Sequence, residues 1–175
     1  QRHSHLRILL DQLRRQTVPP LEIIVVDQSP LPEREPSLKS DFSDLPLKII
    51  YQDLPGQCTA RNTAIRLSRG EYLLFLDADV EVLPTTLEKH LQVISWLHAD
   101  ASSGTVHEPG EQDFSSTFLR TRVSSVFPMG NTLLKKSLLQ KSGLFDLAYD
   151  HGARADGDLG MRIYLSGALV VQDLA

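Results

Sequence analysis

Two carboxylates one residue apart, Asp77 and Asp79, come directly after an apolar run at residues 72–76. Carboxylate oxygens are hard ligands, and they suit Mg²⁺ or Mn²⁺ carrying phosphate groups better than they suit a soft metal. We therefore expect these two acids to hold a divalent cation, with Asp79 as the direct ligand. The alternative is that both acids are solvated and only cap the helix that follows.

Two further residues have types and positions suited to nucleotide binding. Asp27 ends a second, β-branched run at residues 21–26, so it also follows a predicted strand. Arg61 stands near the start of a predicted helix, where its guanidinium and the helix dipole would both favour a phosphate. For Arg61, an ion pair with a nearby acid is an equally weighted alternative.

The elements that must position these residues alternate between helix and strand through residues 1–100. The apolar spacing predicts helices over 3–16, 59–69 and 84–98 and strands over 21–27, 47–51 and 72–76. This order is typical of an α/β fold with a mostly parallel sheet and right-handed crossovers. The apolar strands should then be buried on both faces. The carboxyl ends of such strands share one edge, so Asp27, Asp77 and Asp79 should lie on one active face.

The remaining segments have weaker patterns. The connection at 28–46 is polar and holds four prolines, so we expect it on the surface rather than in the core. Residues 107–125 have no clean period, and an active-site loop and a short helical insert both fit. Further on, the sequence predicts strands over 101–106, 126–134 and 168–172 and helices over 137–141 and 156–166.

Composition limits the function classes. The chain has 175 residues, 41% apolar and 23% charged, which is typical of one soluble globular domain. A formal charge of −4 argues against nonspecific binding of nucleic acid, and we expect no nucleic-acid partner. Cys58 is the only cysteine, so we expect a packing role for it. No apolar stretch of about 18 residues and no signal peptide occurs in this portion.

Three blocks of the sequence occur together, in this order, in one known family. They are residues 21–29, residues 56–79 from Gly56 to Asp79, and a late block made of 143–146 and 156–162. With these blocks the chain resembles the family 2 glycosyltransferases of the GT-A fold over nearly its whole length. The resemblance implies one GT-A domain over 1–175, with a nucleotide-binding half at about 1–100 and an acceptor-side half at about 101–175.

The resemblance also implies a reaction. It is the inverting, metal-assisted transfer of a sugar from a nucleotide-diphosphate-sugar, with UDP as the expected nucleotide, to a saccharide or lipid-linked acceptor. The resemblance further implies a role in polysaccharide biosynthesis. It also implies a cytoplasmic location, including the cytoplasmic face of the membrane, with peripheral membrane association. Mn²⁺ or Mg²⁺ is the expected cofactor, because a divalent ion stabilises the charge on the departing diphosphate.

Residue roles can be carried over position by position. Asp27 would accept hydrogen bonds from the base or ribose, and Asp77 would reach the ribose, the metal or a metal-bound water. Asp156 matches the general base, and capping of its own helix is the structural alternative. Asp158 would support the loop. Asn62 would fix a loop by hydrogen bonding.

Two departures from the family stand out. Ala155 occupies the position of a glutamate that would orient the acceptor. An apolar strand that precedes the first helix in the family has no counterpart, and the chain ends inside a late strand. We therefore expect the natural protein to extend beyond residues 1–175 at both ends.

Other functions remain open at this point. A catalytically silent GT-A-like module that binds a nucleotide sugar or a partner protein agrees with Ala155. A nucleotidyltransferase also places acids at strand ends, and so does a receiver domain that accepts a phosphoryl group. The receiver domain does not explain the block at 56–79 or the late pair of acids.

Overall fold

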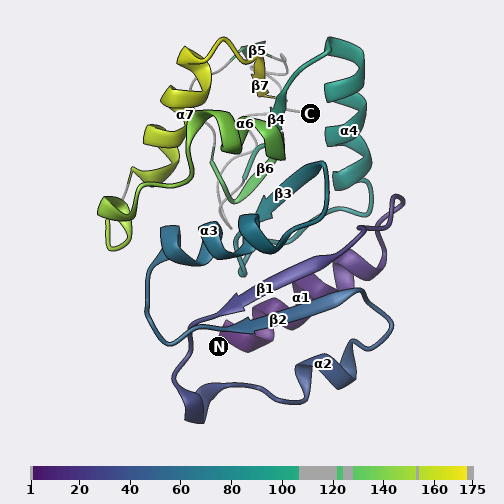
Figure 1. Ribbon diagram of the computed structural model, residues 1–175. Coiled ribbons are helices and arrows are strands. Elements are labelled where there is room, and N and C mark those ends of the chain that lie inside the picture. The colour runs from purple at the N-terminus through teal and green to yellow at the C-terminus, as the bar shows by residue number, and fades with distance from the viewer. Residues whose placement is uncertain (1, 107–121, 124–127, 153, 173–175) are drawn as a thin grey trace.

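The computed structural model describes residues 2–106, 122–123, 128–152 and 154–172. Figure 1 shows the strands β1 and β2 in the lower half and a larger sheet above them, with helices around both. The helices are α1 (Arg2–Arg14), α2 (Leu38–Asp41), α3 (Gln57–Leu67), α4 (Thr86–Leu97), α6 (Lys136–Ser142) and α7 (Ala155–Leu165), with 3-10 turns η1 (Leu31–Glu33) and η2 (Leu147–Tyr149). The strands are β1 (Ile23–Asp27), β2 (Leu47–Tyr51), β3 (Tyr72–Leu76), β4 (Ala101–Ser103), β5 (Arg122–Val123), β6 (Asn131–Lys135) and β7 (Val170–Gln172).

The α/β class predicted from the sequence is confirmed, and β2 and β3 have their predicted bounds. The other predicted helices and strands are present, most of them with shifts of one or two residues at their ends. Two predicted strands are shorter, because β4 ends at Ser103 rather than at residue 106 and β6 begins only at Asn131 within the predicted 126–134. Within 107–125 the structure describes only Arg122 and Val123, so the loop or insert predicted there lies outside the described residues, as do residues 126 and 127 of the next predicted segment.

The strands form two sheets, a parallel one of two strands and a larger one of mixed direction. β1 pairs in parallel with β2, and the second sheet has the order β3-β6-β4-β7-β5. In that sheet β6 runs antiparallel to both β3 and β4, and β5 runs antiparallel to β7. The pair β4 and β7 is parallel. The prediction of a mostly parallel sheet is therefore wrong for the larger sheet.

The reason for this difference is the late strand β6. β3 and β4 run in the same direction, as the crossover through α4 requires, because both are antiparallel to β6. They are not neighbours, since β6 lies between them. The alternation of helix and strand in residues 1–100 predicts the crossover but cannot reveal a strand that is inserted later.

An apolar cleft of about 680 Å³ separates the two sheets. Its walls include Ile23–Val26 of β1, all of β3, and apolar side chains of α1 and α3, namely Leu6, Leu9, Leu10, Leu13, Ala60, Ala64 and Ile65. No described strand pairs with the edge of β1 or of β3 that borders this cleft. Both strands are consequently half-buried along their whole length, and the prediction of burial on both faces is wrong for them. The further apolar strand expected from the resemblance stays a prediction.

The connection at 28–46 contributes to a core, which the sequence did not predict. Leu38 and Phe42 are 3% and 4% exposed and pack against Leu10 of α1. Their spacing of four residues places Phe42, the residue directly after α2, on the same side as Leu38. Arg7 and Arg14 lie over the Phe42 ring at 5.8 and 5.0 Å, and their ion pairs with acids of the connection fix it to α1.

The main core lies between the larger sheet and the helices α3, α6 and α7. Its buried members are Cys58, Ile65, Ala101, Met129, Leu134, Leu138, Leu139, Phe145, Ala155, Leu159, Ile163 and Val170. This core fixes α3 and α7 on the larger sheet, and these two helices carry Arg61 and Asp156. Among the described residues no helix is both long enough and apolar enough to cross a membrane.

Candidate active site

Arg61, on α3, lies between two of the predicted site acids. Its Nη1 donates to Oδ1 of Asp156 at 2.8 Å, and its Nη2 lies 3.3 Å from Oδ1 of Asp77. The guanidinium carbon lies 5.3 Å from the centre of the Phe145 ring. The side chain is 17% exposed, so one partly buried cation holds the acid at the end of β3 and the acid at the start of α7. The ion-pair alternative for Arg61 is thus what the structure shows.

Asp77 is held close to the backbone of Gly130. A Cβ on residue 130 would lie 2.9 Å from Oδ2 of Asp77, so a larger residue would push the carboxylate away. The Asp77 side chain is 52% exposed, which leaves it accessible to a ligand. Asp79 is also exposed, and its carboxylate has no hydrogen bond or ion pair with any described residue. The predicted cap on the next helix is thus not made by Asp79.

Asp156 lies in the first turn of α7 but does not cap that helix. Oδ1 accepts from Arg61, and Oδ2 accepts a hydrogen bond from the backbone N–H of Met129 at 3.1 Å. The N-cap of α7 is Arg154, in the left-handed region at φ 91°, without a side-chain cap. The carboxylate is therefore turned toward α3 and toward Met129, just before β6, and the capping interpretation of Asp156 is wrong.

Asp158 and Arg162 hold the turn between α6 and α7. Arg162 donates to Oδ2 of Asp158 at 2.6 Å and to the carbonyl oxygens of Ser142 and Leu144 at 2.7 and 3.0 Å. The predicted supporting role of Asp158 is confirmed. Arg162, which the resemblance placed in the acceptor-side block, has the same structural role.

Asn62 fixes the loop that carries Phe145, as predicted. Its amide donates to the carbonyl oxygen of Phe145 at 2.8 Å and accepts from the N–H of Phe145 at 2.9 Å. The Phe145 ring also meets Phe75 of β3 edge-on, with centroids 6.0 Å apart. These contacts hold the ring against Arg61. Cys58, one turn earlier, is fully buried, and burial raises the pKa of its thiol, so its predicted packing role is also confirmed.

Asp150, which the sequence reasoning missed, occupies the N-terminus of α3. Its carboxylate accepts from the Thr59 N–H at 2.8 Å and from the Thr59 hydroxyl. Burial alone would raise the pKa of Asp150, but these hydrogen bonds outweigh it and leave the pKa below its ordinary value. Gly56, at φ 154°, makes this approach possible, because a Cβ added at this position would lie 2.6 Å from Cγ of Asp150. We expected the dipole of α3 to attract a phosphate beside Arg61. The N-terminus of this helix is already bound by the Asp150 carboxylate.

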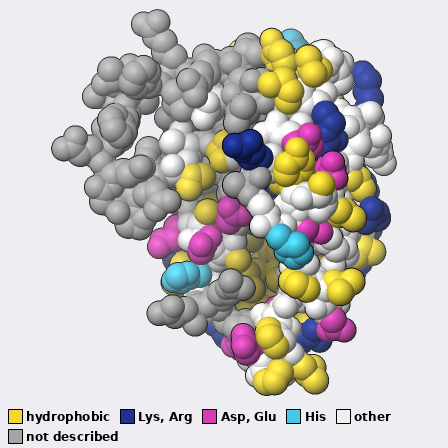
Figure 2. Space-filling model, turned by 90° about the vertical axis from the view of Figure 1, so that its left-hand side faces the viewer, with side chains coloured by type: hydrophobic (Ala, Val, Ile, Leu, Met, Phe, Trp, Pro, Cys, Tyr) yellow, Lys and Arg dark blue, Asp and Glu magenta, His cyan; other side chains and the backbone are white. Residues whose placement is uncertain are grey.

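Asp27 lies at the carboxyl end of β1, as predicted, but in the other sheet from Asp77 and Asp79. Its Oδ1 accepts the N–H of Ser29 at 2.8 Å, which fixes the turn after the strand. The structure records no contact between Asp27 and the other site residues within its described part. Figure 2 views the molecule from the side to which β1 and β2 point and shows acidic side chains around a hollow with hydrophobic side chains at its floor.

The described residues hold no group of three or more His, Cys, Asp or Glu side chains that could enclose a metal ion by themselves. Asp79 and Asp77 therefore offer at most two carboxylate ligands. Mg²⁺ commonly binds in this way, through one or two carboxylates together with substrate phosphates and water. The acids present fit a cation that binds together with a diphosphate, and they do not fit a closed, all-protein metal cage.

Ala155 is 3% exposed and belongs to the main core together with Cys58. The position at which the resembling family has an acid is therefore a small apolar packing position here. A glutamate at this site would place a charge in the main core.

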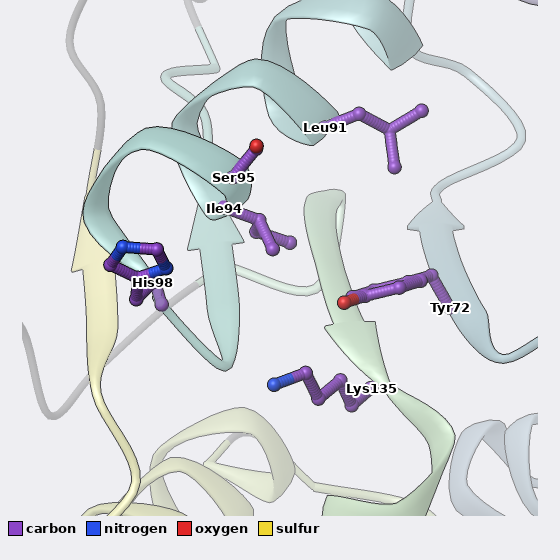
Figure 3. A pocket seen from close by; sticks show the side chains of 7 residues that line it. Tyr72, Leu91, Ile94, Ser95, His98 and Lys135 are labelled. Atoms are coloured by element: carbon purple, nitrogen blue, oxygen red, sulfur yellow. The ribbon is translucent and has the colours of Figure 1, made fainter.

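A second pocket of about 440 Å³ lies apart from these acids, between α4 and the strands β3 and β6. Figure 3 shows Tyr72 and Lys135 on neighbouring strands, with Ile94, Ser95 and His98 of α4 across from them. Lys135 Nζ is ion-paired with Asp100 at 3.0 Å, so its charge is already compensated.

Solved structures confirm the fold. Chain TarS 1-349 of S. aureus in complex with UDP superposes with a TM-score of 0.79 and 21% identity, over 98% of this chain and 54% of that one. The mannosyltransferase PcManGT of Pyrobaculum calidifontis, in complex with GDP-Man and Mn²⁺, gives a TM-score of 0.78 and 24% identity, over 98% and 51%. The architecture is the GT-A type expected from the sequence.

The sequence relatives of this chain are also glycosyltransferases. Glycosyltransferase GlyA of Streptococcus pneumoniae is 26% identical over 96% of this chain and 27% of its own length. Glycosyltransferase YwdF of Bacillus subtilis is 26% identical over 79% of this chain and 56% of its own length. The chain thus spans less than two thirds of each of these relatives. The sequence model described as "Glycosyl transferase family 2" matches residues 2–155, and the chain belongs to that family.

Proposed function

We propose that this protein transfers a sugar, with inversion, from a UDP-sugar to a saccharide or lipid-linked acceptor, with a divalent cation at Asp79 and Asp77. Membership of the family supports glycosyl transfer, and the finer points rest on the site. The observation that carries the proposal is that Arg61 joins Asp77, on the proposed donor side, to Asp156, the proposed base.

The donor side of the proposal rests on Asp77 and Asp79. Both are exposed at the end of β3, and Asp79 has no competing partner among the described residues. A divalent cation there would neutralise charge on the departing diphosphate. The solved relatives bound to UDP, UDP-GlcNAc, and GDP-Man with Mn²⁺ support a nucleotide-diphosphate-sugar as donor. Asp27 would then contact the base or ribose from the neighbouring sheet.

The acceptor side rests on Asp156. Inverting transfer needs a base that takes the proton of the attacking hydroxyl on the side of the sugar opposite the diphosphate. One Asp156 oxygen is held by Arg61 and the other by the Met129 N–H, so the carboxylate has a fixed orientation, and its side chain is 33% exposed. An acceptor hydroxyl that approaches it donates its proton to the carboxylate as the bond to the sugar forms.

A comparison of Asp156→Asn with Asp158→Asn tests this assignment. The asparagine at 156 keeps the shape of the side chain but cannot accept the proton, so transfer should fall by about a hundredfold or more while donor binding survives. Asp158→Asn serves as the matched control, because Asp158 contacts Arg162 on the same helix and not Arg61. A screen of nucleotide sugars with Mn²⁺ identifies the donor first. Near wild-type transfer by Asp156→Asn at saturating donor would show that Asp156 is not the base.

A catalytically silent module that binds a nucleotide sugar is the second candidate, and the observation that favours it is the buried Ala155. The same screen separates the two, because a silent module would bind UDP but would neither transfer nor hydrolyse any donor. The cytoplasmic location, the peripheral association with a membrane and a role in polysaccharide biosynthesis stay predictions.

A further inference from the structure

Arg61 contacts its two carboxylates unequally. The contact with Asp156 measures 2.8 Å and involves a side chain that is 33% exposed, whereas the contact with Asp77 measures 3.3 Å and involves one that is 52% exposed. Phe145 lies on the face of the guanidinium, and Asn62 fixes the loop that carries this ring. The contacts to Asp156 and Phe145 therefore hold Arg61 in place, and the longer contact to Asp77 is the one that can give way.

A divalent cation at Asp79 and Asp77 would compete with Arg61. The Asp77 carboxylate cannot keep a guanidinium as close partner while it also binds a doubly charged ion, since the two cations repel each other. The second oxygen of Asp77, Oδ2, faces residue 130, where an added Cβ would lie 2.9 Å from it. Asp77 is therefore in a position to exchange one cation for the other without a large displacement.

We infer that Arg61 acts as a replaceable counter-charge, which neutralises Asp77 in the donor-free protein and releases it when the cation and diphosphate bind, while keeping Asp156 in place. This inference rests on the proposed function, since it assumes a cation at Asp79 and Asp77. Once Asp77 is released, Nη2 of Arg61 would have an N–H able to donate to a phosphate oxygen of the donor. Arg61 is on this account a positioning residue for Asp156 and a competitor of the metal.

The two roles predict effects of opposite sign for one substitution. In Arg61→Ala, Asp77 has lost its competing cation, so the protein without nucleotide should bind Mn²⁺ more tightly, by about two- to fivefold, the range that corresponds to the loss of an exposed ion pair. The same variant should transfer sugar with a kcat lower by about a hundredfold, because Asp156 has lost its fixed orientation. Arg61→Lys keeps a positive charge but cannot hold both acids with one planar group, so it should bind Mn²⁺ nearly as wild type and recover only part of kcat.

The experiment is a calorimetric titration with Mn²⁺ alone, together with kcat and donor KM, for wild type, Arg61→Ala, Arg61→Lys and Arg66→Ala. Arg66 is the matched control, since it is an exposed arginine on the same helix and has no ion pair with a described residue. Thermal unfolding of each variant shows that it is folded, and Arg61→Gln replaces Arg61→Ala if the latter is not.

Two results would overturn the inference. One is that Arg61→Ala weakens Mn²⁺ binding and lowers kcat together, as expected if Arg61 is purely structural. The other is an unchanged Mn²⁺ affinity in Arg61→Ala. If wild type binds UDP equally well with and without Mn²⁺, the metal assignment itself fails, and the inference fails with it.

Discussion

Asn62 and Phe145 exchange two hydrogen bonds, from the Asn62 amide to the Phe145 carbonyl and from the Phe145 N–H back to the Asn62 carbonyl oxygen. Asn62 is 2% exposed, so both contacts are buried. Asn62→Ala would leave a buried N–H and a buried C=O without these partners. We expect a loss of about 3 kcal/mol in the free energy of unfolding, measured by urea denaturation.

Thr63→Ala is the matched control for Asn62→Ala, because Thr63 neighbours Asn62 on α3 and makes no side-chain hydrogen bond with a described residue. It should change the free energy of unfolding by about 0.5 kcal/mol or less. Equal losses in the free energy of unfolding for the two substitutions would show that the Asn62 hydrogen bonds to Phe145 do not contribute specifically to stability.

Asp79→Asn should remove the dependence of UDP binding on Mn²⁺ without unfolding the protein. Asp79 is exposed and makes no contact with a described residue, so its loss costs the fold little. Because removal of even a supporting group commonly weakens a metal site by about tenfold or more, loss of a direct ligand should weaken it at least as much. Calorimetry with UDP, with and without Mn²⁺, measures the effect. Glu81→Gln makes the same change of charge two residues away, and it should leave the Mn²⁺ dependence intact.

Gly130→Ala should displace the Asp77 carboxylate. The added methyl group would lie 2.9 Å from Oδ2 of Asp77. A shift of about 1 Å in a positioned group can cost about a hundredfold in rate, so kcat/KM for transfer should fall strongly. Gly157→Ala is the control, since a Cβ there meets nothing within 4 Å. If Gly130→Ala transfers sugar at the wild-type rate, the position of the Asp77 carboxylate close to residue 130 is not required for transfer.

Asp150 should make the stability of the protein depend on pH in the acid range. The pKa of Asp150 is lower in the folded protein than in the unfolded chain, so the folded protein holds its proton less tightly. The stability it contributes is therefore fully present above the unfolded pKa of about 3.9 and is lost as the pH falls through the folded pKa. Asp150→Asn should cost about 1 kcal/mol at neutral pH, like the loss of a helix cap.

The measurement for Asp150 is the free energy of unfolding of wild type and Asp150→Asn from pH 7 to pH 3. The difference between the two proteins should shrink as the pH falls below about 4, because the Asp150 carboxyl of the unfolded chain takes up a proton there while that of the folded protein is still ionised. A difference that stays constant over the whole range would contradict the role given to the Asp150 carboxylate.

Sequence reasoning succeeded where a local pattern decides the structure. The apolar run before Asp77 and Asp79 is a strand with the predicted bounds, and the late helix carries Asp156 in its first turn. It failed where residues far apart in the chain meet. The contact of Asp150 with Thr59 spans 91 residues, and no local pattern marks an acid that caps a distant helix.

The same limit explains the errors in the sheet. β6 lies between β3 and β4 although it follows both in the chain, so its direction depends on a connection whose residues lie mostly outside the described part. The capping interpretation of Asp156 also failed for a non-local reason, because Arg61, 95 residues away, and Met129 bind its two oxygens. Local rules predict that an acid lies at a helix start but not which partner it takes.

The cleft between β1 and β3 has a consequence for how residues 1–175 behave in solution by themselves. Each of these strands has five residues, and the structure's described part supplies no ladder partner for the edge that borders the cleft. A row of free amide and carbonyl groups beside apolar side chains is a template on which strands from other molecules can add, and such edges promote aggregation. Wherever this cleft is left open, fluorescent dyes that bind exposed apolar surface should bind there, and aggregation should increase as the protein concentration rises.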